Sequence, residues 1–252
     1  MFIDTHCHLT DEYEGGIDSV IDRAKGAGVG ALICATAEGI DIKLALKIAE
    51  THDNIFVTTG IHPDHTDLNP YDFLTDEILN NPHVVGVGEI GLDYHYASEN
   101  RDAQIELFEK QLDIAYNHDM PVAIHTRDAD EDTATILTQK YHGVMHCFTS
   151  SWDLAKIMLD RGFYFSASGI LTFKNAESIR ETFAKIPNDR IVIETDSPYC
   201  APVPHRGKVC EPAFVIETAK VLAQIKNLQI DELETILCEN TQRLYKKCHV
   251  KL

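Results

Sequence analysis

The sequence has no stretch of about 18 uninterrupted apolar residues, which a membrane-spanning helix requires. It does not start with a basic segment followed by an apolar block, so a secretory signal is not expected. The seven cysteines include no CxxC pair, and Cys34 and Cys147 lie in apolar runs, where a free thiol behaves as a small hydrophobe. These absences predict a cytoplasmic protein with reduced cysteines and no membrane partner.

Positive charge is also scarce. The chain has 22 Lys and Arg against 40 Asp and Glu, which gives a formal net charge of −18. A non-specific duplex binder normally carries a basic face that releases counterions. A broad nucleic-acid surface is therefore not expected, and any phosphate-bearing substrate must be held by a local group of cations.

No linker rich in Pro, Gly or Ser and no block of like charges interrupts the chain, so we expect one domain over residues 1–252. Short apolar segments recur at intervals of roughly 20 to 40 residues, as βαβ units require. They are near-continuous apolar runs, which are typical of parallel strands buried on both faces. The predicted strands span residues 2–9, 31–35, 55–59, 84–88, 122–124, 144–145, 163–166 and 191–193.

Amphipathic segments with helical spacing separate these strands. Gly28 is expected to end the first helix. The last helix is expected to begin at Asp231, with Glu234 three residues on as its capping partner. The predicted helices span residues 16–28, 40–50, 73–79, 103–118, 133–140, 153–161 and 176–186, with two more before the end of the chain. This alternation predicts an α/β fold, a single (β/α)8 TIM barrel. An open doubly wound sheet is the alternative.

The first predicted strand ends in two histidines, His6 and His8. Successive side chains on a strand point to opposite faces, so these two imidazoles project to the same side. Two neutral imidazoles on one face make half of a metal site. The alternative is a pair of surface histidines where the strand runs out.

Metal-competent side chains also stand at the ends of later strands. In a barrel, those ends converge on the C-terminal mouth, where active sites are built. We therefore expect a metal site at this mouth, although any one of the side chains alone could simply cap its strand. The predicted ligands are His6, His8, Glu89, His125, His146 and Asp196.

Six ligands are more than one tetrahedral ion needs, so two divalent ions bridged by one carboxylate fit better. Paired ions favour hydrolysis, because a water held between two cations becomes a hydroxide near neutral pH. A mixed set of histidines and carboxylates suits Zn²⁺ or Mn²⁺ and does not exclude Mg²⁺. A barrel whose metals are only structural is the non-enzymatic alternative.

From its first residues to nearly its last, the chain resembles the TatD-type metal-dependent deoxyribonucleases, which are amidohydrolase-like metal-dependent hydrolases. Each motif is weak alone, and their order along the chain makes the resemblance specific. The motifs are IDTHCHL at 3–9, GIHP at 60–63, GEIGLD at 88–93, HTR at 125–127, HCF at 146–148, SG at 168–169, TFKN at 172–175, ETDSPY at 194–199 and ENT at 239–241.

The resemblance implies how the ligands divide between the two ions. His6, His8 and Asp196 would hold one ion, His125 and His146 the other, and Glu89 would bridge them. It also implies that His62 and Glu194 contact substrate or an additional ion.

Two further carboxylates have open roles. Glu194 shares a strand face with Asp196, so it should point into the mouth, or else be hydrogen-bonded within the barrel. Asp4 should point inward beneath His6, either to orient an imidazole or as a polar plug in the barrel floor.

Basic residues near the predicted mouth are candidates for binding phosphate oxygens. Arg127 lies two residues beyond His125 and shares its face, and the mouth loops carry Lys174, Arg206 and Lys208. The family usually has an asparagine where this chain has Cys210, which puts the substrate contacts near that position in doubt.

Together these features predict a divalent-metal-dependent nuclease that cleaves phosphodiester bonds in DNA or RNA. Asp196 would help to deprotonate the attacking water, and Arg127 would stabilise charge beside the ions, with Glu89 and His62 completing the catalytic set. The acidic composition favours short strand ends over long duplex, and so an exonuclease. The alternative is an amide, lactone or ester hydrolase, including one that deacylates aminoacyl-tRNA, because the same metal site would serve these reactions.

Overall fold

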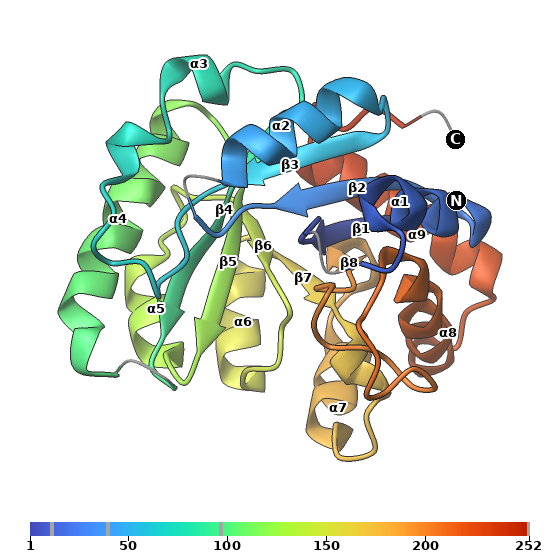
Figure 1. The fold of residues 1–252 in the computed structure, drawn as a ribbon. Helices are drawn as coiled ribbons and strands as arrows, with labels where there is room; N and C mark the ends of the chain where they lie inside the picture. The colour runs from blue at the N-terminus through green and yellow to red at the C-terminus, as the bar shows by residue number, and fades with distance from the viewer. Residues whose placement is uncertain (11–12, 39–40, 96–97, 251–252) are drawn as a thin grey trace.

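Eight parallel strands form one sheet in this computed structural model, and each strand pairs with the next one in the sequence (Figure 1). The structure describes residues 1–10, 13–38, 41–95 and 98–250. The strands are β1 (Phe2–Cys7), β2 (Val29–Ala35), β3 (Ile55–Thr59), β4 (Val84–Asp93), β5 (Val122–Arg127), β6 (Gly143–Met145), β7 (Tyr164–Ala167) and β8 (Ile191–Ile193).

The segment after β8 returns to β1 and nearly closes the sheet. The amide of Asp196 donates to the carbonyl of His6 at 2.9 Å, and the amide of His8 donates to the carbonyl of Ser197 at 2.7 Å. Cys7 and Ser197 also form an isolated parallel bridge. The predicted (β/α)8 TIM barrel is therefore confirmed, and the open-sheet alternative is wrong.

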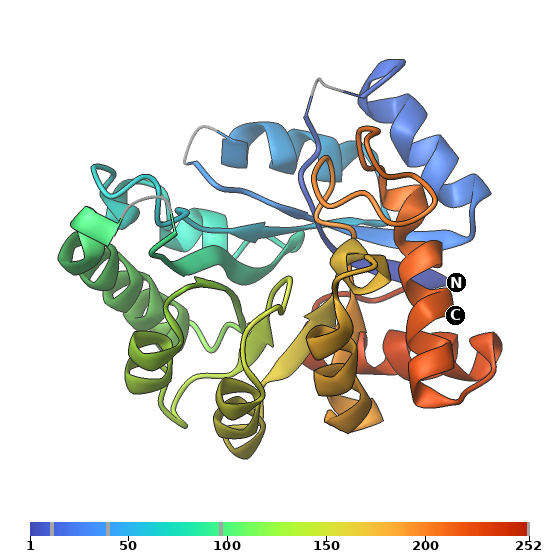
Figure 2. The ribbon, with the colours of Figure 1, turned by 90° about the horizontal axis from the view of Figure 1, so that it is seen from below.

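Helices alternate with the strands and surround the barrel (Figure 2). Their buried residues recur at helical spacing and face the outer surface of the sheet. The helices are α1 (Gly16–Gly26), α2 (Asp41–Thr51), α3 (Asp76–Leu79), α4 (Arg101–Asn117), α5 (Asp130–Ile136), α6 (Trp152–Asp160), α7 (Glu177–Lys185), α8 (Val215–Lys226) and α9 (Ile230–Leu244). In the described part of the chain, none of them is long and apolar enough to cross a membrane.

Neighbouring residues on each strand pack into two different hydrophobic cores. On β2, Leu32 belongs to the outer core with the helices, and Ile33 belongs to the inner core of the barrel. Tyr245, which follows α9, joins the inner core and is fully buried. With the floor of the barrel filled in this way, the opposite end remains for a site.

Two predicted helices differ from the observed ones. The helix expected at 73–79 is only the short α3, because the Thr75 hydroxyl accepts from the amide of Ile78 and so caps a new helix start. The helix expected at 133–140 begins earlier and ends at Ile136. Leu137 is extended, so the last carbonyls of the helix have no helical amide to accept from. The Arg161 guanidinium donates hydrogen bonds to two carbonyls at this end of the helix, those of Ala134 and Leu137.

The ends of two other helices test the capping predictions. Gly28 adopts a φ of 92° just beyond α1, as expected for a residue that ends a helix. The cap predicted for the last helix is wrong, because α9 begins at Ile230 and Gln229 makes no side-chain cap. The Glu234 carboxylate instead pairs with the N-terminal amine of Met1.

Candidate metal centre

The six predicted ligands come together at the C-terminal mouth of the barrel, and Glu89 lies at their centre. β4 is longer than expected, so Glu89 lies within the strand. Between Val87 and Ile90 the strand advances three residues while its partner β5 advances two, from Val122 to Ile124. Such a bulge re-aims the side chains beside it, here that of Glu89.

The two carboxylate oxygens of Glu89 face different sets of histidines. Oε2 lies 3.5 Å from His6 Nε2 and 3.8 Å from His8 Nε2. Oε1 lies 2.8 Å from His125 Nδ1 and 3.3 Å from His146 Nε2. Although burial opposes its charge, the surrounding imidazoles, that of His146 foremost, hold the pKa of Glu89 well below its usual value. An ionised carboxylate therefore lies between the two sets.

Asp196 completes the first set. Its Oδ1 lies 3.7 Å from His8 Nε2 and 4.0 Å from the Nε2 atoms of both His6 and His146. Two ligand atoms about 2.1 Å from one tetrahedral ion are about 3.4 Å apart, close to most of these separations. Several of the gaps are too long for hydrogen bonds and wide enough to span an ion. The donor atoms of this mouth therefore fit divalent cations.

His62 lies beside the second set. Its Nε2 is 3.8 Å from Glu89 Oε1, and its ring lies edge-on to that of His125, with centroids 4.7 Å apart. His62, Glu89 and His125 form one group of side chains able to share an ion. His146 instead stacks on His6, with ring centroids 3.6 Å apart, so it lies between the two sets.

Sequence reasoning missed Asp93, which lies 3.1 Å from His125 Nε2 through its Oδ2. It is buried, and Gln104 accepts a hydrogen bond from its backbone amide. Burial lowers the pKa of His125, but Asp93 and Glu89 outweigh it and raise that pKa to about 9. The missed signal was the two-residue alternation from Glu89 through Gly91 to Asp93, which places both carboxylates on one strand face.

Glu194 points inward as expected, but it lies behind a histidine and away from the open mouth. Its Oε1 lies 2.9 Å from His146 Nδ1, which is an ion-pair distance, but the two groups are not aligned for a hydrogen bond. The same oxygen accepts a hydrogen bond from the amide of Cys147 at 2.8 Å. Only 1% of Glu194 is exposed. This geometry suits a residue that orients His146 and leaves little surface for a substrate to contact.

Asp4 also points inward, and its partners are not imidazoles. Its carboxylate accepts from the Thr195 amide at 2.9 Å, the Thr195 hydroxyl at 2.5 Å and the His6 amide at 3.3 Å. The polar-plug alternative therefore describes Asp4 better than the orienting role, because it ties β1 to the segment after β8.

The predicted cationic residues lie in different places. Arg127 is exposed at the end of β5 and lines, with His125, a mouth cavity of about 1100 Å³. Arg206, Lys174 and Lys208 are exposed and are not among the described residues that line this cavity. Arg206 stacks on the Phe173 ring, its guanidinium carbon 3.8 Å from the ring centroid.

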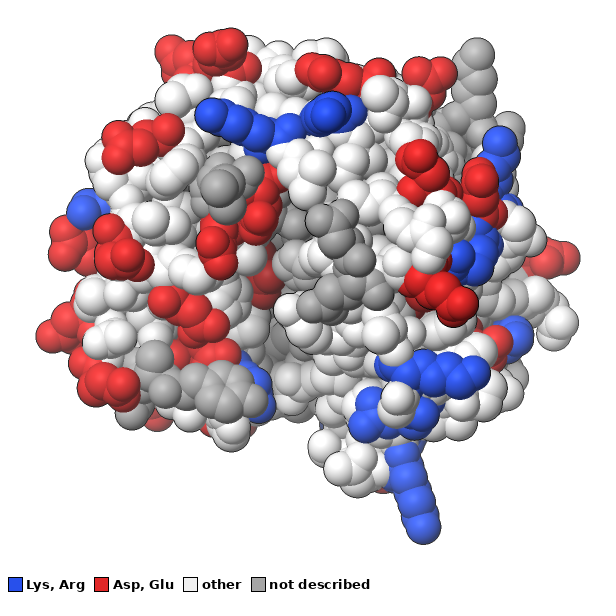
Figure 3. Space-filling model, viewed as in Figure 1, with Lys and Arg blue, Asp and Glu red and all other residues white. Residues whose placement is uncertain are grey.

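Charge is unevenly distributed over the face in Figure 3. Acidic side chains dominate the side built by α3, α4 and α5, and basic side chains gather over the loop between β8 and α8. That loop carries Arg206 and Lys208, together with Cys210, which is buried against the segment after β8. These basic side chains therefore lie on the loop that follows Asp196 in the sequence.

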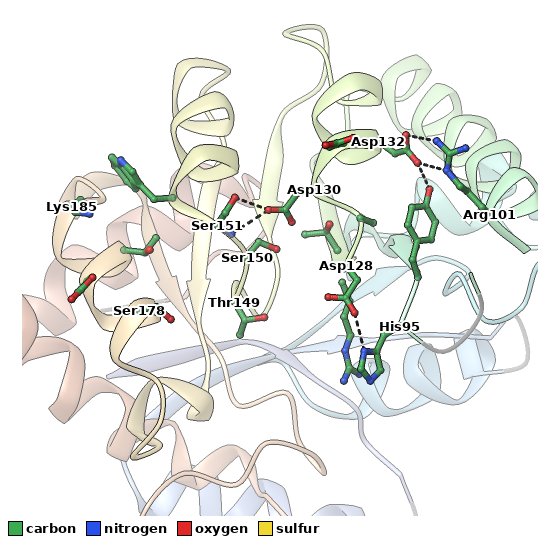
Figure 4. Close-up of a pocket in the computed structure, with 18 residues that line it drawn as sticks. His95, Arg101, Asp128, Asp130, Asp132, Thr149, Ser150, Ser151, Ser178 and Lys185 are labelled. Carbon is green, nitrogen blue, oxygen red and sulfur yellow. Dashed lines mark hydrogen bonds and ion pairs between the residues drawn. The ribbon is translucent and has the colours of Figure 1, made fainter. Parts of the chain in front are cut away.

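A second cavity of about 1040 Å³ shares Arg127 in its lining with the mouth cavity. Figure 4 shows the side chains that line this second cavity. Its lining has five carboxylates against three cationic side chains, Arg101, Arg127 and Lys185, so it is acidic on balance. Several of the carboxylates are paired: Asp132 with Arg101 at 2.7 Å, Asp128 with His95 at 2.9 Å, and Asp130 with the Ser151 hydroxyl at 2.7 Å. We call it the acidic groove. Its charge disfavours a polyanion along this side.

Comparisons with known proteins identify the family of the chain. A model of the family described as TatD related DNase matches residues 3–246. The chain is 38% identical to the uncharacterized metal-dependent hydrolase YabD of Bacillus subtilis, over 98% of this chain and 99% of that one. It is also 38% identical to the uncharacterized metal-dependent hydrolase YcfH of Escherichia coli K12, covering 96% and 95%.

A solved structure agrees as well. The crystal structure of YjjV, a TatD homologue from Escherichia coli, superposes with a TM-score of 0.90 at 28% identity, covering 97% of this chain and 98% of that one. The fold, the metal-competent mouth and the matches over nearly the whole chain lead to one conclusion. The chain belongs to the TatD family of metal-dependent hydrolases.

Proposed function

We propose that this hydrolase is a nuclease that removes nucleotides from the ends of DNA or RNA by cleaving phosphodiester bonds. The observation that carries the proposal is the position of Glu89, whose two carboxylate oxygens face separate histidine sets beside Arg127 in one cavity. The description of the matching family, TatD related DNase, supports the choice of substrate.

The ligand set would hold two divalent ions of Mg²⁺, Mn²⁺ or Zn²⁺. His6, His8 and Asp196 would hold one, His125 and His146 the other, and Glu89 would lie between them. When bound, such ions supply a nucleophile at neutral pH and stabilise negative charge on the transferring group.

Side chains of the mouth would accept the proton of the attacking water and hold the phosphate. Asp196 would accept the proton of the attacking water at Oδ2, the oxygen that does not face His8. Although burial opposes its charge, the neighbouring imidazoles of His8 and His146 lower the pKa of Asp196 and keep it ionised. Arg127 would pair its planar guanidinium with phosphate oxygens. His62 would position the phosphate or an additional ion from the opposite side.

The charge of the rim restricts how a strand can approach. A polyanion that continued past Arg127 would enter the acidic groove, where the local charge opposes it. The loop that carries Arg206 and Lys208 offers the more favourable side. A site open to a polyanion on one side only suits a strand end better than the interior of a long duplex.

The metal centre by itself would also serve an amide, lactone or ester hydrolase, including one that acts on the ester of an aminoacyl-tRNA. The net charge of −18 and the acidic groove favour this second function, because both disfavour long polyanions. A metal-reconstituted assay separates the two. End-labelled single-stranded DNA and RNA would be tested beside a panel of amides, lactones and esters. Turnover confined to the panel would exclude the nuclease.

A further inference from the structure

Two thiols lie at the mouth beside Asp196, and the metal centre described above does not use them. Cys147 follows β6, and Cys200 lies in the loop after β8. Both side chains are partly exposed and line the mouth cavity. Cys147 Sγ lies 3.1 Å from the hydroxyl of Ser168. The thiols are therefore open to solvent ions through the same entrance as the substrate.

Asp196 connects these thiols to the metal centre through its two oxygens. Oδ1 faces His8 at 3.7 Å, and Oδ2 lies 3.4 Å from Cys200 Sγ. One ligand atom each from Cys147, Asp196 and Cys200 lies within 4.8 Å of the others. Ligands about 2.0 to 2.3 Å from one tetrahedral ion are about 3.3 to 3.8 Å apart, so small side-chain movements would bring these three atoms to the separations that one ion requires.

The backbone directs these three side chains to one place. Cys147, Asp196 and Cys200 have φ angles of 40°, 57° and 54°. Positive φ is uncommon for residues other than Gly, and such conformations cluster at functional sites. Since two of the three donors are thiols, which prefer soft cations, their chemistry differs from that of the imidazole and carboxylate centre beside them.

We propose that Cys147, Cys200 and Asp196 form a separate site for a soft divalent cation such as Zn²⁺. Three protein ligands leave a fourth position for water or for another exchangeable ligand. Because the site takes Oδ2 of Asp196, an ion bound there removes the proton acceptor of the hydrolytic reaction. Excess soft cation therefore inhibits the enzyme. This inhibition rests on the proposed function, whereas cation binding at the thiols does not.

Cadmium is a suitable probe, because binding to thiolates gives an ultraviolet charge-transfer band. Reduced, chelated protein is titrated with Cd²⁺ while this band and the bound metal are measured. Wild type should show the band with one tight equivalent at the thiols. Cys200→Ser and Cys147→Ser should each weaken this binding at least tenfold and diminish the band.

Cys34→Ser is the matched control, because Cys34 lines the same cavity at the end of β2 and is not in the thiol cluster. It should keep the band. Glu89→Gln should also keep it, so failure of the metal centre would be seen separately. An equal band and equal Cd²⁺ uptake in wild type and Cys200→Ser would overturn the proposal, as would loss of the band in Cys34→Ser alone.

Discussion

Glu194 lies directly behind His146, with Oε1 2.9 Å from Nδ1 of the imidazole. The same oxygen accepts from the amide of Cys147, so the carboxylate is fixed from two sides. A histidine that presents Nε2 to a metal commonly places its other nitrogen against a carboxylate, which sets the tautomer and the ring orientation. The residue first expected to contact substrate is therefore better described as a positioning residue for His146.

Glu194→Gln should keep the fold and lower affinity for divalent cations by about ten- to a hundredfold. The amide keeps the size of the side chain and can still accept from Cys147, but it removes the charge beside His146. Isothermal titration of the chelated protein with Mn²⁺ measures this effect. Glu181→Gln, on the acidic groove, is the matched control and should bind as wild type does. Unchanged affinity in Glu194→Gln would exclude the positioning role.

Glu89→Gln should bind at least one ion fewer than wild type, and its rate of hydrolysis should be roughly a hundredfold or more lower. The substitution keeps the size of the side chain and removes the charge that faces both histidine sets. Metal content and turnover are measured on the same sample. If both ions stay bound and the rate is near normal, Glu89 is not the shared ligand.

Arg127→Met should retain the metals and lower kcat/KM on a labelled oligonucleotide by about ten- to a thousandfold. A guanidinium matches phosphate oxygens in pairs, and Arg127 lines the metal-bearing cavity. Arg206→Met should have a smaller effect, because Arg206 stacks on Phe173 away from that lining. Normal cleavage of DNA by Arg127→Met would count against the nuclease.

Cleavage by wild type should also weaken as salt rises, with a shallow slope. Only a few phosphates can be contacted on a surface this acidic, and each contact contributes to the dependence on salt. A series of initial rates in increasing NaCl measures the slope. A steep slope would indicate many phosphate contacts and a different path for the strand.

Asp4 should make stability depend on pH in the chelated protein. Burial, the main cause, raises the pKa of Asp4 from 3.8 to about 8 despite its bonds to Thr195. In the unfolded chain the Asp4 carboxyl ionises from about pH 4, whereas in the folded chain it stays protonated up to about pH 8. The contribution of Asp4 to the free energy of unfolding is therefore full below pH 4 and is lost as pH rises to 8. Asp4→Asn cannot ionise and should gain stability relative to wild type over this range. Denaturant unfolding at several pH values measures the difference, and a constant difference would contradict it.

Much of the fold could be predicted from the sequence, because period-two and helical patterns follow from local geometry. His6, His8 and Asp196 could be placed at one mouth because the ends of barrel strands converge. Glu89 could be chosen as the shared ligand only through the family resemblance. The position of its carboxylate between two histidine sets depends on a bulge in β4, and no local sequence pattern predicts that bulge. The helix expected at 73–79 was predicted too long. Thr75 lies at an interior position of the expected helix, but in the structure it caps the start of α3.

The side-chain neighbours were harder to predict. The contact of Glu194 with His146 joins two strands that are far apart in the sequence, and strand periodicity gives only the inward direction. The cluster of Cys147 and Cys200 depends on loop conformations with positive φ, which single residues other than Gly rarely reveal. The loop position of Arg206 predicts a side chain at the mouth, but its guanidinium stacks on Phe173 and is not part of the described lining of the mouth cavity.

On the proposed function, divalent cations at this mouth drive hydrolysis of phosphodiester bonds. The most direct test follows the cleavage of end-labelled single-stranded DNA by exhaustively chelated protein as Mn²⁺ or Mg²⁺ is added back, with bound metal determined in parallel. We predict no cleavage by the chelated protein and full recovery as about two ions bind per chain. Full turnover with metal analysis showing none bound, or two bound ions without cleavage of any nucleic acid, would contradict the account.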